Sequence, residues 1–210
     1  RELVRNPDVA AIVIDTYSPG GAVTGVDEAS RAVFDARGSK PIVAIANYLM
    51  TSAAYWIASA ADQVVAPPSA EVGSIGVYAA HVDYSEAERL AGRKTTLVSA
   101  GKYKVEGNPY QPLSSTARDY LQSRVNETYS AFVAAVARNR GVTAAHVRQS
   151  FGEGRTFLGA EAVRRGLADR VDTLDRMVLR LGARPAPPRS GSSADGQQNR
   201  IRAAALADLE

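Results

Sequence analysis

Ser52 is the residue of this sequence best placed to act as a nucleophile. The run 41–46 before it is apolar, which predicts a strand buried on both faces, and a helix is predicted to begin at Ser52 itself. Where a strand gives way to a helix, the first helical amides lack main-chain partners and a serine hydroxyl is held in the open. The Ser52 hydroxyl could therefore attack a carbonyl carbon.

Two further features could stabilise the oxyanion that this attack creates. The amide of Ala53 lies in the first turn of the predicted helix, and the small side chains of Ala53 and Ala54 leave room for a substrate main chain. The turn 18–21 can direct a second amide at the same point, because Gly20 and Gly21 tolerate unusual dihedral angles. The residues alone do not choose between these two glycines.

The proton acceptor is harder to identify. His81 falls in a predicted strand and His146 in a predicted helix, and neither lies in a turn-rich loop. Lysine can serve where burial disfavours its charged form and lowers its pKa, and Ser/Lys pairs are a known variant of the nucleophile–base scheme. Lys102 and Lys104 would share one strand face, so spacing leaves both open. Together these residues predict acyl transfer from an amide.

Composition narrows the alternatives. The chain has 210 residues, which fits one domain plus a tail, and a net charge of +3 with acidic and basic residues interleaved, so nucleic-acid binding is not indicated. The absence of cysteine excludes disulfides, thiol catalysis and cysteine metal sites, and two isolated histidines predict neither a metal site nor a cofactor. No run of about 18 apolar residues occurs, so no membrane segment is expected in this chain.

The hydrophobic pattern predicts an α/β architecture. Strands and helices alternate in the order β-turn-α-β-α-β, which favours a parallel sheet with crossover helices. The predicted strands span 10–14, 42–46, 64–66, 73–78 and 95–99, and the predicted helices span 26–37, 52–61, 85–90, 114–140 and 143–147. Segments 159–166 and 172–181 complete the predicted α/β body.

The composition changes after Gly182. Residues 183–199 are rich in Pro, Ser, Gly and Gln, which predicts a flexible linker, and 200–210 predict the start of a further, scaffold-like helix. The chain also begins abruptly, close to its first predicted strand. We therefore expect a segment to precede Arg1.

Four segments in the right order resemble the signal peptide peptidase A (protease IV) family of serine peptidases. The nucleophile segment is similar to 52–62, and the other three are similar to 18–21, 73–77 and 99–104. The resemblance runs from about Ile12 to Leu181. In single-domain members of this family, the lysine follows the serine at a characteristic distance along the chain. Counted from Ser52, this distance leads to Lys104 rather than to Lys102.

This resemblance implies a Clp-protease/crotonase-like fold for a Ser/Lys peptidase domain over 1–182. It implies Ser52 as nucleophile, Lys104 as general base, Ser74 as the residue that orients the lysine amine, and an oxyanion hole formed by Ala53 with one of the two turn glycines. It also implies an endopeptidase acting on polypeptides as a ring-like homo-oligomer, in which Lys104 can reach Ser52 of a neighbouring subunit.

The chain departs from bacterial members in ways that are similar to the phage branch of the family. Ala53 and Ala54 stand where those members usually have Gly-Gly, and Tyr17 stands where they have Asn or Asp. These alanines, with 101–109 and 151–155, resemble head-maturation or minor-capsid proteases. That branch implies capsid, scaffold or portal partners in the host cytoplasm or a virion precursor. If an N-terminal anchor precedes this chain, the protein would instead be held at a membrane.

Other interpretations remain open at this level. Ser52 could be a helix N-cap, Ser74 a structural serine, and Lys104 a surface lysine like most lysines. The whole chain could be a bacterial peptidase that degrades signal peptides, or a capsid-assembly protein of the same fold that cleaves nothing. A crotonase-type acyl-CoA enzyme would share the fold but needs no Ser/Lys pair.

Overall fold

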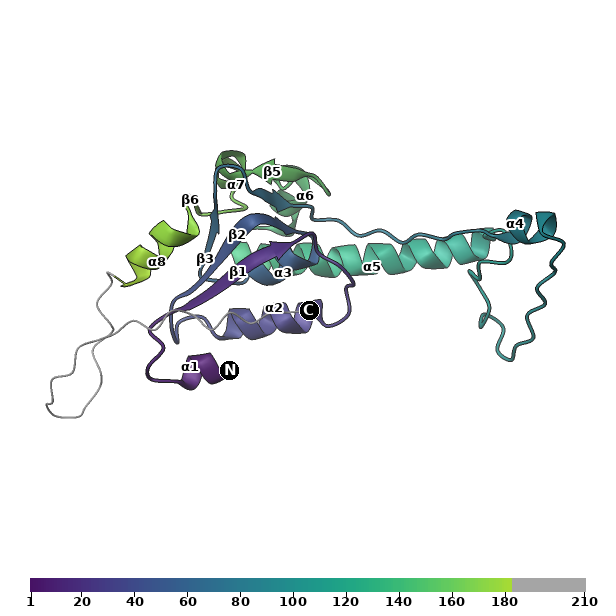
Figure 1. Ribbon diagram of the computed structural model, residues 1–210, viewed down its shortest axis with the longest axis horizontal. Coiled ribbons are helices and arrows are strands. Elements are labelled where there is room, and N and C mark those ends of the chain that lie inside the picture. The colour runs from purple at the N-terminus through teal and green to yellow at the C-terminus, as the bar shows by residue number, and fades with distance from the viewer. Residues whose placement is uncertain (183–210) are drawn as a thin grey trace, which may run out of the picture. The chain divides into compact units, whose positions relative to one another are not determined.

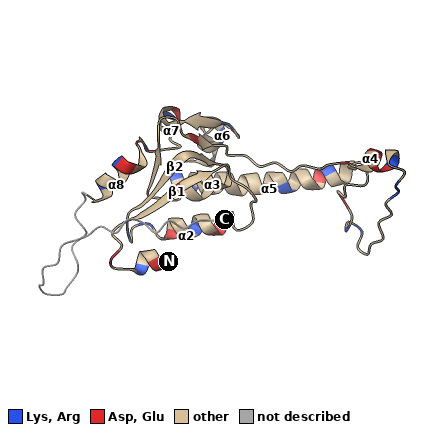
Figure 2. Cartoon of the chain, in the orientation of Figure 1, with Lys and Arg blue, Asp and Glu red and all other residues tan. Residues whose placement is uncertain are grey.

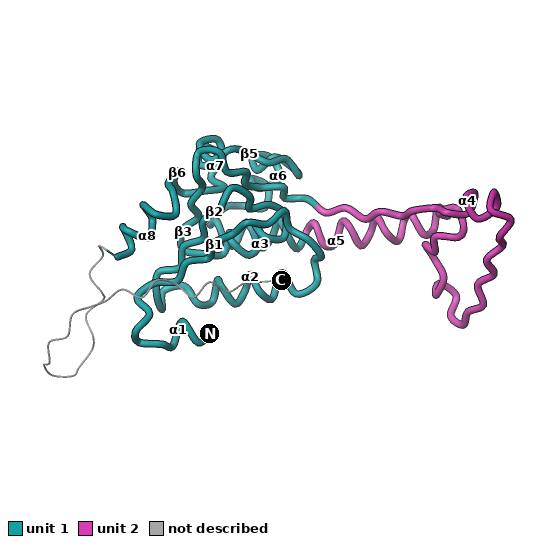
Figure 3. The backbone as a smooth tube through the Cα atoms, in the orientation of Figure 1, with its two compact units in different colours: residues 1–76, 131–210 teal, residues 77–130 magenta. Residues whose placement is uncertain are grey.

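The computed structural model describes residues 1–182, and these fall into two units (Figure 3). Unit 1 comprises residues 1–76 and 131–182, and unit 2 comprises residues 77–130. The predicted linker, 183–199, and the predicted helix, 200–210, lie outside the described residues.

Unit 1 is built on a mainly parallel sheet. Its strand order is β5-β4-β2-β3-β6, with β1 paired to β2, and every pairing is parallel except the antiparallel pair β4–β5. The strands are β1 Ile12–Ser18, β2 Ile42–Thr51, β3 Gln63–Ala66, β4 Glu71–Gly73, β5 Thr156–Leu158 and β6 Arg170–Val171.

Helices α3 and α7 pack on this sheet, and α3 contacts both β1 and β2 while α2 packs on α3 (Figure 1). The order β1-α2-β2-α3-β3 confirms the alternation that the sequence predicts. The helices are α1 Glu2–Arg5, α2 Val26–Asp35, α3 Ala53–Ala58, α6 Ala144–Ser150, α7 Gly159–Arg165 and α8 Leu174–Gly182, and α5 Ser115–Arg140 begins in unit 2 and ends in unit 1.

The strand before Ser52 is longer than predicted. Strand β2 runs to Thr51, whereas the prediction ends at residue 46. The prediction ends there because an irregularity in the strand interrupts the apolar pattern after that residue. Thr16 of β1 pairs with Ala46, but the next residue of β1 pairs with Leu49, so Asn47 and Tyr48 are extra residues. Such a bulge bends a strand and often lies beside a functional site.

Two of the predicted strands, 73–78 and 95–99, are wrong in the main. Only Gly73 of the predicted strand 73–78 belongs to a strand, and residues 95–99 form none. His81, which is also predicted to lie in a strand, does not lie in one. Both segments carry β-branched residues but lack a neighbouring strand, and strand propensity has little force without one. Conversely, β5 and β6 were not predicted, because two or three residues are too few to show a period.

Buried polar contacts fix the C-terminal end of α3. The guanidinium of Arg37 donates to the carbonyls of Ser59, Ala60 and Ala61, and also to that of Asn139. These bonds satisfy carbonyls that the end of a helix leaves without partners. The side-chain amide of Asn139 donates to the Ser59 hydroxyl, 2.9 Å away. The helix that follows Ser52 is therefore anchored at its far end.

The side chains of α3 anchor it further. Trp56 stacks on Phe132 with ring centroids 4.4 Å apart, and the hydroxyl of Tyr55 donates to the carbonyl of Leu167 at 2.8 Å. Burial raises the pKa of Tyr55, so the phenol stays protonated and keeps this bond. The start of α3 is consequently held in a fixed position relative to the sheet.

Unit 2 lacks a core of its own. It contains α4 Ser85–Leu90 and the first part of α5, and of residues 77–130 only Ala117 is buried. Many of its large apolar side chains are exposed. They include Tyr78, Val82, Tyr84, Leu90, Val98, Tyr103, Tyr110 and Tyr120. About 54 residues without a hydrophobic core would not be stable alone.

Charged residues of both signs are spread along the helices. Figure 2 shows basic and acidic segments interspersed along α5 and α8. No helix within residues 1–182 has both the length and the apolar character needed to cross a bilayer.

Candidate active site

Ser52 adopts a backbone conformation that is uncommon for a residue with a side chain. Its φ is 54° and its ψ is −125°, and it occupies the N-cap position of α3. The side chain makes no capping hydrogen bond, and its hydroxyl has no hydrogen-bond partner among the described residues. A strained residue of this kind costs about 1–3 kcal/mol and is typical of functional sites. The N-cap interpretation therefore finds no hydrogen bond to support it.

The turn before α2 lies directly against Ser52. A Cβ added to Gly20 would be 2.6 Å from the Cβ of Ser52 and 2.9 Å from the amide nitrogen of Ala53. Real Cβ atoms do not approach so closely, so only glycine fits here at the observed φ of 98°. The structure thus brings Gly20, Ser52 and Ala53 together, as the sequence predicts.

The two glycines of this turn differ in what their amides do. The Gly20 amide donates to the Ser18 hydroxyl at 3.2 Å. The amides of Gly21 and Ala53 have no hydrogen-bond partner within the described residues. Of the two glycines, Gly21 therefore has the amide that is free to bind an oxyanion, and Gly20 permits the close approach of the turn to Ser52.

Ser74 lies beside Ser52 at the end of the neighbouring strand. Thr51 of β2 pairs with Gly73 of β4, so the two serines follow paired residues. The Ser52 amide donates to the Gly73 carbonyl at 2.9 Å, and Ser74 has a φ of 55°. Carboxyl ends of parallel strands commonly carry functional residues in α/β folds. Of the predicted site, Ser52, Ser74, Ala53 and both glycines belong to one edge of the sheet.

The predicted base belongs to unit 2. Lys104 is exposed in a turn, with its amide donating to the Gly101 carbonyl at 3.1 Å. The ammonium of Lys102 instead lies 5.0 Å from the centre of the Tyr103 ring, a cation–π contact. Because Lys104 and Ser52 belong to different units, their pairing stays a prediction.

Sequence reasoning missed two contributors to this edge of the sheet, Gly73 and Arg155. Both contribute a main-chain carbonyl. The Gly73 carbonyl accepts a hydrogen bond from the Ser52 amide, and the Arg155 carbonyl accepts one from the Ser74 amide at 2.8 Å. Every residue has a main-chain carbonyl, so the residue type does not reveal which carbonyl accepts such a bond. The signal that could have found Gly73 is its residue type. Its φ is 121°, a conformation that favours glycine, and a glycine begins the segment 73–77.

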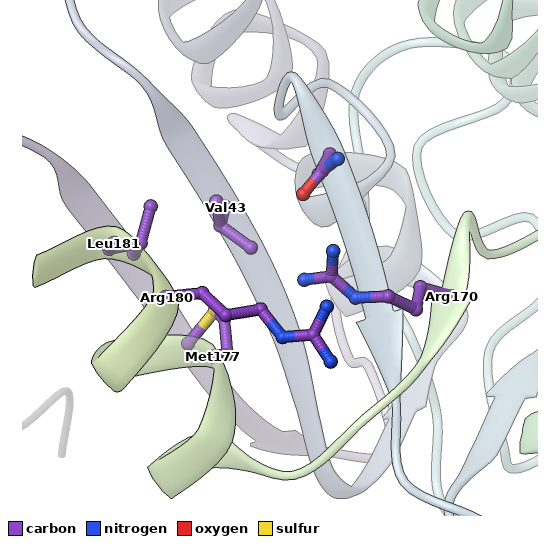
Figure 4. Close-up of a pocket in the computed structure, with 6 residues that line it drawn as sticks. Val43, Arg170, Met177, Arg180 and Leu181 are labelled. Atoms are coloured by element: carbon purple, nitrogen blue, oxygen red, sulfur yellow. The ribbon is translucent and has the colours of Figure 1, made fainter. Parts of the chain in front are cut away.

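A groove elsewhere in unit 1 is remote from Ser52. It lies between α8 and the strands β2, β3 and β6 (Figure 4), and its lining residues are Val43, Gln63, Arg170, Met177, Arg180 and Leu181. Val43 is near the start of β2 and Ser52 follows its end. At about 3.3 Å per strand residue, the two are roughly 25–30 Å apart. The groove is therefore separate from the candidate active site.

Three curated proteins are similar to this chain. A candidate protease of Methanocaldococcus jannaschii is 32% identical over 180 residues, which is 86% of this chain and 58% of that protein. Capsid assembly protease C of Escherichia phage lambda is 35% identical over 85% of this chain and 40% of its own length. Head-tail preconnector protein GP5 of Enterobacteria phage P21 is 28% identical over 95% of this chain and 41% of its own length. The chain thus spans between 40% and 58% of these relatives.

Solved structures are similar in fold. Two mutants of the 1510-N membrane-bound stomatin-specific protease superpose with a TM-score of 0.51 at 14% identity, and the first covers 83% of this chain and 70% of its own. At this identity the likeness shows the fold alone, which is Clp-protease/crotonase-like. The family assignment rests on sequence. Peptidase family S49 matches residues 35–184, more than half of the sequence, and the chain belongs to that family.

Proposed function

We propose that this chain is the catalytic part of a serine endopeptidase that uses Ser52 as nucleophile and Lys104 as general base. The observation that supports it most directly is the strained conformation of Ser52, whose hydroxyl has no partner among the described residues and lies beside the free amide of Ala53. Strained residues cluster at active sites, and a serine hydroxyl that is not used as a cap is free to act as a nucleophile.

The proposed reaction has two halves. The Ser52 oxygen attacks the carbonyl carbon of a peptide bond while the uncharged Lys104 amine accepts the hydroxyl proton, and the amides of Ala53 and Gly21 bind the oxyanion. The proton then passes to the leaving amine as the C–N bond breaks, which leaves an ester on Ser52. Water hydrolyses this ester with Lys104 again as base, and the Ser74 hydroxyl orients the lysine amine.

The names of the two solved neighbours agree with a proposal that involves a serine and a lysine. One is a serine-to-alanine mutant of the stomatin-specific protease, and the other is a lysine-to-alanine mutant of the same protease in complex with a substrate peptide.

Assembly would give Lys104 the environment that a base needs. An exposed lysine is protonated at neutral pH, so the amine must be buried before it can accept a proton. Unit 2 carries Lys104 together with exposed apolar side chains, among them Tyr78 at 89% and Val98 at 94% exposure. Apolar surface of this kind marks an interface. We therefore propose a ring-like homo-oligomer in which packing around unit 2 buries the lysine, within one subunit or between neighbours.

We propose capsid or scaffold proteins of a phage or prophage as the substrates, because a capsid assembly protease and a head-tail preconnector protein are among the relatives. The test incubates the purified protein with the capsid and scaffold proteins encoded beside its gene. Discrete fragments that fail to form with the Ser52→Ala variant are expected. Intact capsid and scaffold proteins, alongside cleavage of an unrelated unfolded protein, would refute the substrate assignment but leave the peptidase.

Gly20→Ala is expected to lower kcat/KM about 100-fold, the loss that a 1 Å misplacement of a catalytic group can cause. The added methyl group would collide with the Ser52 side chain and the Ala53 amide. Gly25→Ala is the matched control, because Gly25 also has a positive φ, 80°, but nothing lies within 4 Å of the added carbon. Steady-state kinetics and melting temperatures of both variants provide the measurement. Equal losses in the two variants would contradict the placement of the turn against Ser52.

A further inference from the structure

A single peptide group connects the nucleophile to the loop 151–155. The carbonyl of Gly73 accepts a hydrogen bond from the Ser52 amide at 2.9 Å, and the amide of Ser74 donates to the Arg155 carbonyl at 2.8 Å. This carbonyl and this amide belong to the same peptide bond. Because a trans peptide is planar and its C=O and N–H point in opposite directions, the group forms a rigid bridge from Ser52 to Arg155.

The bridging peptide is held in an unfavourable conformation. Its two flanking residues both have positive φ, 121° at Gly73 and 55° at Ser74. The second of these carries a side chain, so the conformation persists only where the surroundings enforce it. A Cβ at Gly73 would lie 2.9 Å from the Arg155 carbonyl oxygen, so this contact tolerates only glycine. Rotation of the peptide would break both hydrogen bonds at once.

The loop that receives the bridge is itself tightly shaped. Its residues Gly152, Glu153 and Gly154 have φ values of 89°, 46° and 95°, and the amide of Arg155 closes the turn by donating to the Gly152 carbonyl at 3.1 Å. A Cβ at Gly152 would lie 2.5 Å from the ring of Phe157. The position of the Arg155 carbonyl is therefore determined by close packing within the loop.

Arg165 fixes both ends of this loop. Its guanidinium donates to the Ser150 carbonyl at 2.9 Å on one side and lies 4.2 Å from the centre of the Phe157 ring on the other. Phe151 is fully buried, and Gly76 approaches Gly154 so closely that an added Cβ would lie 3.3 Å from its Cα. The loop is thus anchored to the body of unit 1 and in contact with the segment that follows Ser74.

We propose that the loop 151–155 is a positioning element of the active site. Through the Gly73–Ser74 peptide it fixes the main chain of the nucleophile and the direction of the Ser74 hydroxyl, although none of its residues touches the reacting atoms. This proposal rests on the proposed function of Ser52. It assigns a role to Gly152 and Arg155, which the Ser/Lys mechanism does not use.

The test compares Gly73→Ala, Gly152→Ala and their combination with Gly38→Ala. Gly38 has a φ of 78° and nothing within 4 Å of an added Cβ, so its variant carries the backbone strain alone. Each of the first two changes is expected to lower kcat about 100-fold with KM within about 3-fold, because catalysis rather than ground-state binding is affected. The double variant should be no slower than the slower single variant, since both act through one peptide.

The measurements distinguish a failure of the positioning role of the loop from a failure of the proposed function of Ser52. Single variants with the kcat of Gly38→Ala, or losses that multiply in the double variant, would overturn the positioning role while the Ser52 assignment stands. Full activity of Ser52→Ala would overturn the proposed function itself. If Gly152→Ala does not fold, the kcat of Gly73→Ala and its rate of labelling by a fluorophosphonate probe decide the question, and rates equal to those of Gly38→Ala refute the proposal.

Discussion

Ser52→Ala is expected to abolish peptide cleavage, with a loss of about four to six orders of magnitude in kcat, the range found when a serine nucleophile is removed. Alanine adopts the φ of 54° no more readily than serine does, so the backbone strain is unchanged. The Ser52 hydroxyl also has no hydrogen bond to lose among the described residues. The melting temperature should therefore stay within about 2 °C of wild type, because the substitution removes no hydrogen bond and adds no strain.

Ser52→Gly is the informative companion variant. Glycine adopts a positive φ without a steric penalty, so this variant should be as inactive as alanine yet more stable by about 1 kcal/mol. Thermal unfolding of the three proteins measures the difference. A stable and fully active Ser52→Ala variant would show that another residue is the nucleophile.

Lys104→Ala is expected to lower kcat by about two to four orders of magnitude, which is the contribution of a general base. The matched control is Lys102→Ala, because Lys102 occupies the same turn and carries the same charge but contacts the Tyr103 ring. Its activity should remain within about 3-fold of wild type. Peptide cleavage by each variant, at protein concentrations that keep the oligomer intact, provides the measurement.

The outcome of this pair of variants decides between the two lysines. A large loss in Lys102→Ala with near-normal activity in Lys104→Ala would transfer the base to Lys102. Near-normal activity in both would remove lysine from the mechanism.

Much of the nucleophile's surroundings could be predicted from local sequence. The apolar run 42–46 and the small residues after Ser52 indicate a buried strand that turns into a helix. The glycines at 20 and 21 indicate a turn that can approach closely. Both patterns concern residues adjacent in the chain, where propensity and period are informative. The parallel register of β1 and β2 then places the two junctions side by side.

The remaining features depend on contacts between distant segments. The Arg155 carbonyl reaches the Ser74 amide across the chain, and nothing in either residue type predicts that bond. Likewise, Thr95 to Ser99 has strand-forming residues but belongs to a unit with a single buried residue, so no neighbouring strand completes a sheet there. The second half of β2 is not predicted either, because the bulge at Asn47 and Tyr48 interrupts the pattern of the strand.

The most direct test of the Ser52–Lys104 mechanism is covalent labelling by a fluorophosphonate probe, followed by intact-mass and peptide mass spectrometry. We expect one adduct per wild-type chain, located on Ser52, none on Ser52→Ala, and labelling of Lys104→Ala slowed at least 100-fold, the lower bound for loss of a general base. An adduct on a different residue, or equal labelling rates for wild type and Lys104→Ala, would contradict the mechanism.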